Sequence, residues 1–374
     1  MLPVMDIAKT AEKFDIYGEF LGAEAFGGGI INETFVSRWN QAGTHVRYVH
    51  QKINDRVFPQ PDEVMENILR VTQHIKQKNI ESGRGDFSRR GLTVVLAKDG
   101  KPWVRDEAGG WWRTYLFIEG TCSKNTTANP EEAAFLGESV GLFQKQLSDL
   151  PAPHLHEAIA GFHDMEKRYL AFWAIAEKDE HGRAKDAAAE IGFMKENENR
   201  GGIFVRAMRD KTIKERICHN DTKMNNILVD EKTGKALCMA DLDTVMPGTA
   251  LFDLGDLIRT VAVTASEEET DLCKVRFDTG FFASLLEGYL REAGSFLESR
   301  ELELLAESGR NITHIMALRF LTDWLDGDRY YRTQRPGHNL DRCRNQIALI
   351  KSMDSQWENI TKIAAELAKK HRRL

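Results

Sequence analysis

The stretch that decides the fold lies at residues 219–259 and reads HNDTKMNNILVDEKTGKALCMADLDTVMPGTALFDLGDLIR. Its apolar runs at residues 227–229 and 236–240 have the length of short β-strands. The polar residues between the two runs turn through Gly234, which is typical of a tight connection. The pattern therefore predicts a β-hairpin with polar residues at both ends.

The polar residues at the ends of this hairpin form a chemical set. Asp221 precedes Asn226 by five residues, and Asp241 and Asp243 follow the second strand. Folding of the hairpin is expected to bring Asp221, Asn226 and Asp241 toward one point. Mg²⁺ prefers oxygen ligands and takes only one or two protein carboxylates, with phosphate and water completing its shell. Two oxygen ligands and a free carboxylate are therefore suited to phosphoryl transfer, which requires mainly positioning and neutralisation of charge.

Length and composition indicate an ordered protein with two or three domains or two unequal lobes, since domains average roughly 150 residues. The chain has 374 residues, of which 42% are hydrophobic and 29% charged, so a sizeable core is expected. The formal net charge of −6 gives no general attraction to nucleic acid or to an anionic membrane. The chain has no apolar run of membrane-spanning length and no signal-like segment, and its five cysteines are scattered. We therefore expect a soluble cytoplasmic enzyme without nucleic-acid or membrane partners.

The N-terminal part is expected to be β-rich and the remainder helical. Five strand-like runs and one helical run occur early in the chain, at residues 19–26, 34–39, 46–53, 92–97, 112–118 and 62–78. Residues 1–118 are therefore predicted to form a nucleotide-binding N-lobe, an antiparallel sheet holding one helix. After a hinge at about 118–122, helical periodicity dominates residues 119–374, beginning with helices at residues 131–150 and 156–178. The expected fold class is α+β.

A glycine-rich loop lies between the first two predicted strands. Gly27, Gly28 and Gly29 come shortly before Asn32. Backbone N–H groups in such a loop are suited to bind nucleotide phosphates, although triple glycine also occurs in plain hairpin turns. The chain has no G-x-x-x-x-G-K-[ST] pattern, so a Walker-type phosphate loop is excluded.

The H-x-D-x-x-x-x-N pattern followed by Asp241 resembles the catalytic set of the protein-kinase-like superfamily, in particular its aminoglycoside phosphotransferase branch. Further segments are similar to the N-acetylhexosamine 1-kinases over residues 15–355, namely FGGGIINETF, YLFIEGT, TVMPG and RFLTDWLDGDRYY. The resemblance implies a bilobal kinase-like fold. It also implies transfer of phosphate from ATP, with Mg²⁺, to the anomeric hydroxyl of N-acetylglucosamine or N-acetylgalactosamine.

The resemblance assigns catalytic roles residue by residue. Asp221 is expected to align the attacking sugar hydroxyl or accept its proton, and Lys223 to neutralise charge on the transferred phosphoryl group. Asn226 and Asp241 are expected to hold Mg²⁺. For Asp243 three roles stay open, which are a sugar contact, orientation of the metal site and stabilisation of a turn.

The loop that carries Asp221 is expected to be braced by two further residues. His219 is expected to hold the loop rather than transfer protons. Asp253, in the segment LFDLGD, matches the superfamily aspartate that accepts hydrogen bonds from backbone N–H groups of this loop.

The nucleotide site departs from the protein-kinase pattern at one strand position. Gln51 stands where protein kinases carry a lysine, and Lys52 is expected to point to the opposite face because side chains alternate along a strand. Gln51 is therefore expected to be a neutral phosphate contact, with Lys52 taking that place if the register is shifted by one. Adenine is expected to lie against the backbone of the connector, from Phe117 to Glu119.

The sugar pocket is expected around a late helix and its exit, where Arg319, Asp323, Trp324 and Tyr330 cluster. Arg319 and Tyr330 correspond to sugar-contacting positions of the resembled kinases, and a guanidinium offers several donors to acetamido or hydroxyl oxygens. The alternative for Arg319 is an ion pair with Asp323 four residues along the same helix.

Two other classes of function compete with the sugar kinase. A kinase for an aminoglycoside, choline-like or ribose-type alcohol keeps the same chemistry, but a cationic acceptor requires acidic groups or an aromatic cage, and Arg319 would repel it. A nucleotide-binding regulator without turnover would be expected to lack the base or a metal ligand. Asp221, Asn226 and Asp241 are all present.

Overall fold

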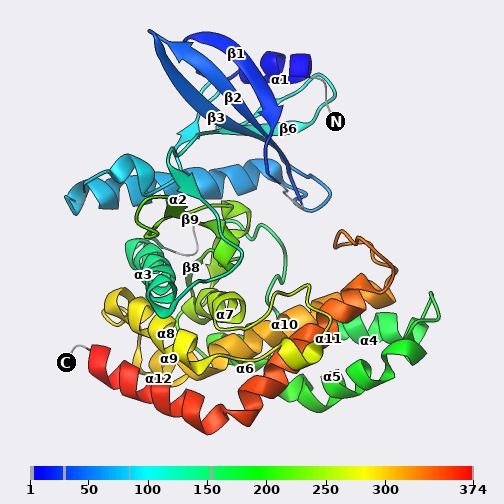
Figure 1. The fold of residues 1–374 in the computed structure, drawn as a ribbon. Helices are drawn as coiled ribbons and strands as arrows, with labels where there is room; N and C mark the ends of the chain where they lie inside the picture. The colour runs from blue at the N-terminus through cyan, green and yellow to red at the C-terminus, as the bar shows by residue number, and fades with distance from the viewer. Residues whose placement is uncertain (1–3, 28–30, 84, 152–154, 373–374) are drawn as a thin grey trace.

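The computed structural model describes residues 4–27, 31–83, 85–151 and 155–372. The predicted loop residues Gly28 and Gly29 lie outside these ranges. The N-terminal elements are α1 (Val4–Ala11), β1 (Glu19–Ala25), β2 (Glu33–Gln41), β3 (Thr44–Lys52), α2 (Pro61–Glu81), η1 (Phe87–Arg89), β4 (Val94–Val95), β5 (Val104–Arg105) and β6 (Trp111–Leu116). Figure 1 shows the sheet at one end of the molecule and the helices at the other.

The sheet is antiparallel throughout and has the order β1-β2-β3-β6-β4, with β5 paired to β6. Strands β2 and β3 are joined by Ala42 and Gly43, both of which have positive φ, at 52° and 86°. Two-residue hairpin turns of this kind match the right-handed twist of the strands they connect. The expected β-rich N-lobe is therefore confirmed, and its first three strands lie where the sequence predicted them.

The two faces of the sheet are covered by different elements. On one face, a small core contains Ile7 of α1 together with Phe35 and Trp112 of the sheet. On the other face, Val49 and Tyr115 pack toward the large core, which contains the apolar side of α2. That side comprises the residues that gave the helical period in the sequence, Val64, Met65, Ile68, Val71 and Ile75, all of them buried.

After Leu116 the chain leaves the sheet, and the short strand β7 (Thr121–Cys122) pairs with β9 (Ile227–Asp230) far along the sequence. The secondary structure thus changes from strand to helix where the hinge was expected. The division into two domains at residues 118–122 stays a prediction.

The C-terminal region is mainly helical, as the α+β fold class requires. Its helices are α3 (Pro130–Leu147), α4 (Met165–Lys178), α5 (Ala188–Gly201), α6 (Ile203–Arg209), α7 (Ala250–Val261), α8 (Thr279–Ala293), α9 (Ser299–Glu303), α10 (Leu305–Leu325), α11 (His338–Ser355) and α12 (Trp357–His371). Its short strands and 3₁₀ turns are β8 (Arg216–Cys218), β10 (Ala236–Met239), β11 (Met246–Gly248), η3 (Ala184–Ala187), η4 (Met224–Asn226), η5 (Leu242–Thr244) and η6 (Leu272–Lys274). The predicted hairpin is confirmed as the antiparallel pair β9–β10.

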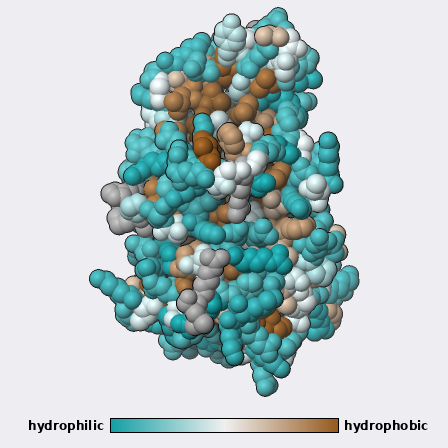
Figure 2. Space-filling view, turned by 90° about the vertical axis from the view of Figure 1, so that its left-hand side faces the viewer, coloured by the Kyte–Doolittle hydropathy of each residue, from teal (hydrophilic) through white to brown (hydrophobic). Residues whose placement is uncertain are grey.

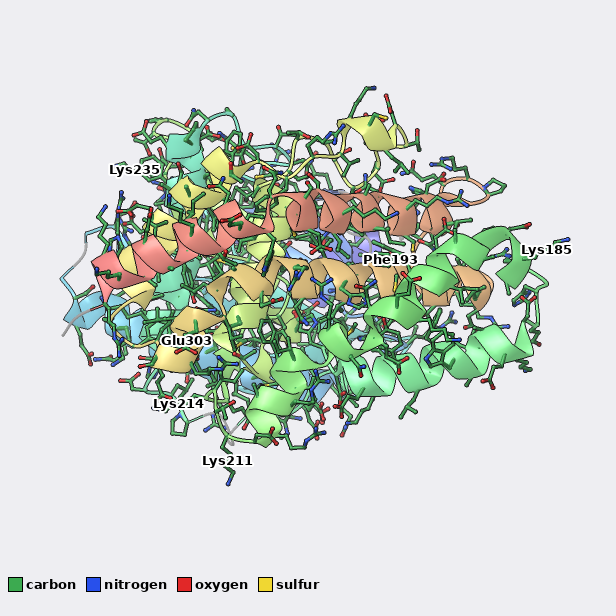
Figure 3. The ribbon with its side chains drawn as sticks, turned by 90° about the horizontal axis from the view of Figure 1, so that it is seen from below. Lys185, Phe193, Lys211, Lys214, Lys235 and Glu303 are labelled. Carbon is green, nitrogen blue, oxygen red and sulfur yellow. The ribbon has the colours of Figure 1, made fainter. Side chains whose placement is uncertain are left out.

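Helices α3 and α8 approach closely because glycines face each other between them. A Cβ atom on Gly137 would lie 2.0 Å from the carbonyl oxygen of Leu285, and one on Gly288 would lie 2.0 Å from that of Ala134. Seen from below, α10 and α11 run side by side next to α5, whose Phe193 faces them, while Lys211 and Lys214 project outward (Figure 3).

One helix begins later than predicted. The expected helix at residues 156–178 starts only at Met165, because Gly161 adopts a positive φ of 64° and Asp164 caps the new helix by accepting a hydrogen bond from the Lys167 N–H at 3.1 Å. Helix α5 ends at Gly201, and α6 begins at Ile203. Helix α1 and strand β5 were not predicted.

The surface is uneven in polarity, and the cysteines are unpaired. On the face shown in Figure 2, apolar side chains gather on the upper part of the molecule, and the lower part is mostly hydrophilic. All five cysteines are free thiols. None of the helices in the described ranges is both long and apolar enough to cross a membrane.

Candidate active site

The loop after β8 is fixed by a buried carboxylate on α7. Asp253 accepts hydrogen bonds from the backbone N–H groups of His219 at 3.1 Å and Asn220 at 2.7 Å. Asn220 itself has a positive φ of 65°, and its side-chain amide donates to the carbonyl oxygen of Thr244 at 3.0 Å. The predicted bracing role of Asp253 is confirmed.

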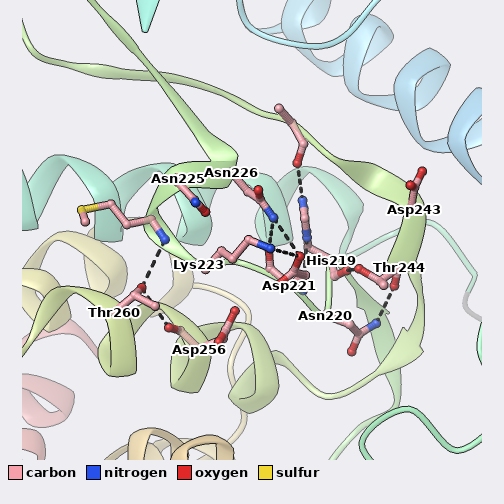
Figure 4. A network of polar contacts seen from close by, with 12 residues as sticks. His219, Asn220, Asp221, Lys223, Asn225, Asn226, Asp243, Thr244, Asp256 and Thr260 are labelled. Carbon is pink, nitrogen blue, oxygen red and sulfur yellow. Dashed lines mark hydrogen bonds and ion pairs between the residues drawn. The ribbon is translucent and has the colours of Figure 1, made fainter. Parts of the chain in front are cut away.

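His219 holds this loop to the end of the hairpin. Its Nε2–H donates to the carbonyl oxygen of Ala240 at 2.8 Å, and its Nδ1 accepts the backbone N–H of Asp221 at 3.3 Å (Figure 4). The ring is fully buried. Both nitrogens are therefore used inside the protein, which confirms His219 as a bracing residue.

The carboxylate of Asp221 is held by two donors from its own loop. Lys223 Nζ donates to its Oδ2 at 2.9 Å, and Asn226 Nδ2 donates to the same oxygen at 3.0 Å (Figure 4). Burial alone would raise the pKa of Asp221, but the charge and hydrogen bond of Lys223, with the hydrogen bond of Asn226, lower it to about 2. Asp221 is thus an ionised carboxylate, 29% exposed, at the point where the hairpin was expected to bring it.

Asn226 and Asp241 lie on neighbouring chain segments, because the N–H of Ala240 donates to the carbonyl oxygen of Asn226 at 2.8 Å. Asp241 has a positive φ of 57°, and part of the residue is open to solvent. The burial of its carboxylate by surrounding protein atoms and the nearby negative charges of Asp243 and Asp221 raise its pKa to about 6. The Asp241 carboxylate therefore lacks full positive compensation.

These residues fit a hard cation that takes most of its ligands from elsewhere. Among the described residues, no three His, Cys, Asp or Glu side chains are grouped to hold a metal by themselves. An amide oxygen from Asn226 and a carboxylate from Asp241 suit Mg²⁺, which leaves its other positions to phosphate and water. The assignment of Mg²⁺ to this pair stays a prediction.

A buried arginine, which the sequence reasoning missed, joins the sheet to the segment after Asp241. Arg113 on β6 is fully buried and forms an ion pair with Asp243, while its Nε donates to Gln51 Oε1 at 2.9 Å. Gln51 and Arg113 are paired residues of adjacent strands. A buried cation therefore lies beside Gln51, the position at which protein kinases carry a lysine. The signal in the sequence was an arginine two residues from Trp111 and two residues from Tyr115 on the same strand.

Lys52 lies on the opposite face of the sheet, as the alternation of side chains predicted. Its Nζ is 3.1 Å from Asp106 Oδ2, and it lies 5.8 Å from the ring centroid of Trp112. It therefore does not take the place of Gln51. In protein kinases the strand lysine pairs with an acidic residue of the following helix. Here the acidic residues Glu63 and Glu66 of α2 both lie beside His156.

Two predicted ligand contacts are replaced by contacts inside the protein. Asn32 was expected to contact the nucleotide, but its Nδ2 donates to Asp243 Oδ2 at 2.5 Å and its Oδ1 accepts the N–H of Asn54 at 3.0 Å. Asp243, one of whose expected roles was a sugar contact, is buried and bound by both Arg113 and Asn32. Its contacts support the alternative role of positioning the segment that carries Asp241.

The connector keeps only part of its backbone free for adenine. The N–H of Phe117 donates to the carbonyl oxygen of Arg47 at 3.0 Å, and the carbonyl oxygen of Glu119 accepts Arg89 Nε at 3.1 Å. The Glu119 carboxylate also binds Arg47, whose guanidinium lies 3.8 Å from the Phe117 ring centroid. Adenine binding along this segment stays a prediction. So does phosphate binding at Gly27, which has a positive φ of 70°.

The expected sugar pocket separates into two parts. Arg319 lies among aromatic rings, with its Cζ 4.7 Å from the centroid of Phe162, 5.5 Å from Tyr330 and 5.3 Å from Tyr331. It does not pair with Asp323, because the oxygens of Asp323 accept the N–H groups of Tyr330 at 2.7 Å and Tyr331 at 2.9 Å. Trp324 is turned away from this pocket, with Arg183 4.1 Å from its ring centroid.

Arg319 and Asp221 are close enough for their charges to interact, since the Asp221 carboxylate is one of the groups that raise the pKa of Arg319 against the opposing effect of burial. Tyr330 lies beside Arg319, whose Nη2 donates to the tyrosine oxygen at 3.4 Å. The structure thus brings Arg319 and Tyr330 together on the Asp221 side of the molecule. Their contact with a sugar stays a prediction.

The chain combines an antiparallel sheet with a helical lobe, and a braced loop carries an ionised aspartate and an asparagine five residues apart. This arrangement defines a phosphotransferase of the protein-kinase-like type. The chain belongs to the phosphotransferase enzyme family, whose model matches residues 22–305. The sequence resemblance to this superfamily is therefore confirmed.

Solved structures of small-molecule kinases share the fold along nearly the whole chain. A microcompartment-associated aminopropanol kinase has a TM-score of 0.63 at 14% identity, with 96% of this chain and 98% of that chain covered. An ethanolamine kinase from Plasmodium vivax has a TM-score of 0.55 at 11% identity, covering 87% and 82%. A spectinomycin phosphotransferase in complex with ADP and spectinomycin has a TM-score of 0.52 at 15% identity, covering 98% and 99%.

Proposed function

We propose that this protein transfers the terminal phosphoryl group of ATP to the anomeric hydroxyl of N-acetylglucosamine or N-acetylgalactosamine, giving the sugar 1-phosphate and ADP. Family membership supports phosphoryl transfer to an alcohol. The choice of acceptor rests on the surroundings of Arg319. Its guanidinium lies among three aromatic rings and forms no ion pair with any carboxylate of the described residues.

The charge of Arg319 separates a neutral sugar from an amine acceptor. Two structural neighbours are an aminopropanol kinase and an ethanolamine kinase, whose acceptors are amino alcohols. An ammonium group beside Arg319 would meet a like charge, while an acetamido or hydroxyl oxygen would accept its N–H donors. The aromatic rings that would otherwise form a cage for a cation already surround the guanidinium.

Asp221 aligns the sugar hydroxyl by accepting its hydrogen bond. A carboxylate with a pKa of about 2 is a weak base, so it takes the proton only as the new bond to phosphorus forms. An anomeric hydroxyl suits this base because it is more acidic than an ordinary alcohol. Lys223, bonded to Asp221 Oδ2, supplies positive charge beside the same oxygen.

Asn226 and Asp241 would hold Mg²⁺, which when bound neutralises charge on the nucleotide phosphates. Arg113 acts from the N-terminal side by fixing Asp243, two residues from Asp241. His219 and Asp253 keep the Asp221 loop in place through the hydrogen bonds described above.

A panel of neutral N-acetylhexosamines, amino alcohols and aminoglycosides, assayed for ADP formation, tests the proposal. We expect acceptor-dependent ADP release with the N-acetylhexosamines and a product phosphate labile to mild acid, as glycosyl phosphates are. Turnover confined to the amino alcohols or aminoglycosides would overturn the choice of acceptor and leave the phosphotransferase assignment intact.

A further inference from the structure

A second arginine accompanies Arg319 in the acceptor pocket. Arg168, on α4, has its Cζ 5.7 Å from the ring centroid of Phe162, and Arg319 approaches the same ring at 4.7 Å. Both side chains are half-buried. Two guanidinium groups are thus held near one aromatic ring.

Neither arginine forms an ion pair with a carboxylate anywhere in the part of the chain that the structure describes. The donors of Arg168 go to a neutral partner, because its Nε donates to the carbonyl oxygen of Phe162 at 2.7 Å. The acidic residues near it along the chain pair with other cations, since Asp164 lies 3.6 Å from Lys167 Nζ and Glu166 lies 2.8 Å from Arg209 Nη1. In the described residues, no carboxylate therefore lies within ion-pair distance of either guanidinium, and Asp221 and Asp256 act on Arg319 only from farther away.

The charges of the two guanidinium groups act on each other and on a neighbouring histidine. Burial and the nearby positive charge of Arg319 lower the pKa of Arg168 to about 9. Burial, followed by the charges of Arg319 and Arg168, lowers the pKa of His163 to about 3. His163 Nε2–H donates to the carbonyl oxygen of Asn220 at 3.0 Å, and Asn220 directly precedes Asp221. The two positive charges therefore act next to the catalytic loop.

Holding two like charges at a half-buried position costs free energy unless an anion binds and neutralises them. Guanidinium groups bind carboxylates and phosphates through several parallel hydrogen bonds, which makes paired arginines suited to such a group. A neutral sugar would use the donors of Arg319 but would leave both guanidinium groups without a directly bonded anion.

We propose that the acceptor sugar carries an anionic substituent, a carboxylate or a phosphate, which binds between Arg168 and Arg319 while the anomeric hydroxyl faces Asp221. This inference rests on the proposed function and narrows its substrate class to acidic N-acetylhexosamines. Arg168 is then a specificity-determining residue, and its hydrogen bond to the Phe162 carbonyl also holds the loop before α4 in place.

The test compares three matched acceptors with the full-length protein: N-acetylglucosamine, its 3-O-(1-carboxyethyl) ether, and the neutral carboxamide of that ether. N-acetylglucosamine 6-phosphate is the fourth acceptor and distinguishes a phosphate from a carboxylate. We expect kcat/KM for at least one anionic sugar to exceed that of its neutral counterpart by about tenfold or more, as a charge-assisted hydrogen bond would give. Equal or higher kcat/KM with the neutral sugars would overturn the inference and leave the sugar kinase assignment standing.

Variants separate recognition from a merely structural arginine. Arg168→Gln should lower the ratio of anionic to neutral kcat/KM by about tenfold, and Arg168→Lys, which keeps the charge, should retain part of it. Lys167→Gln removes a charge from the adjacent, exposed position and should leave the ratio unchanged. An equal loss for both kinds of sugar in Arg168→Gln and Arg168→Lys would overturn the inference. Failure of every sugar to yield a 1-phosphate would overturn the proposed function together with it.

Discussion

The guanidinium of Arg113, on strand β6, is ion-paired with the carboxylate of Asp243, which lies two residues after the candidate metal ligand Asp241. Both side chains are buried. Two residues of the N-terminal region bind this ion pair. Asn32 donates a hydrogen bond of 2.5 Å to Asp243, and Gln51 accepts one of 2.9 Å from Arg113. The segment that carries Asp241 is thus fixed from the sheet as well as from the helical lobe.

Loss of Arg113 should therefore destabilise the protein strongly. Arg113→Met leaves the Asp243 carboxylate buried without its partner, and removal of one member of a buried pair costs about 3–5 kcal/mol. Urea unfolding at pH 7 measures the change. Lys52→Met is the matched control, since Lys52 pairs with Asp106 at 3.1 Å on the other, more exposed face of the sheet. The control should cost about 1 kcal/mol or less. Equal effects of the two variants would show that the pair does not stabilise the site.

Asp221→Asn should reduce turnover by about 10²–10⁴-fold, the range expected for loss of a positioned acid–base group. The asparagine keeps the size of the side chain, so nucleotide binding, measured by calorimetry with ADP, should be largely retained. Wild-type turnover in this variant would remove Asp221 from its role, and a parallel loss of ADP binding would assign it to the nucleotide site instead.

Asp241→Asn should raise the Mg²⁺ concentration needed for half-maximal turnover by about tenfold or more, because one carboxylate ligand is lost. Turnover is measured over a Mg²⁺ titration at fixed ATP, with a chelator control for the wild type. An unchanged half-maximal concentration would place the cation elsewhere. Asn226→Ala should shift the titration in the same direction.

Arg319→Ala should raise the KM for the sugar much more than the KM for ATP, since its guanidinium lies among the aromatic rings of the proposed acceptor site. Arg310→Ala is a control on the same helix, because Arg310 also lies against an aromatic ring, 3.6 Å from the centroid of Trp357. That variant should leave both KM values unchanged. Equal rises in the two KM values for Arg319→Ala would argue for a structural arginine.

Buried histidines should make the fold sensitive to acid. Burial lowers the pKa of His50 to about 4, and burial with nearby arginines lowers that of His314 to about 4. The unfolded chain binds protons near the ordinary pKa of 6.5, so each histidine reduces the stability as the pH falls from 6.5 to about 4. Over this pH range the free energy of unfolding should fall less steeply in His50→Gln or His314→Gln. Each variant removes about one proton from the number that the chain takes up on unfolding. Slopes identical to the wild type would contradict this origin of acid sensitivity.

The sequence predicted the elements whose pattern is local. The β9–β10 hairpin follows from two apolar runs and Gly234, and α2 follows from its apolar period. The bracing of the Asp221 loop was predicted from the resemblance, since His219 and Asp253 match positions of the superfamily motifs. The later start of α4 was missed because the apolar pattern continues through a turn at Gly161.

The contacts across the site were not accessible from spacing alone. Arg113 and Asp243 are 130 residues apart, and only the register of β3 with β6 shows that Arg113 lies beside Gln51, where protein kinases carry a lysine. In the same way, the helix spacing of Arg319 and Asp323 suggested an ion pair. The turn after α10 instead directs two backbone N–H groups onto Asp323, which leaves Arg319 to the aromatic pocket.

The most direct measurement of the central claim is ³¹P NMR of the product made from ATP and N-acetylhexosamines labelled with ¹³C at C1. If the Asp221 site phosphorylates the anomeric hydroxyl, the product signal is split by coupling to the labelled carbon and disappears after mild acid. An acid-stable phosphate without that coupling, or phosphorylation of amino alcohols alone, would contradict the account.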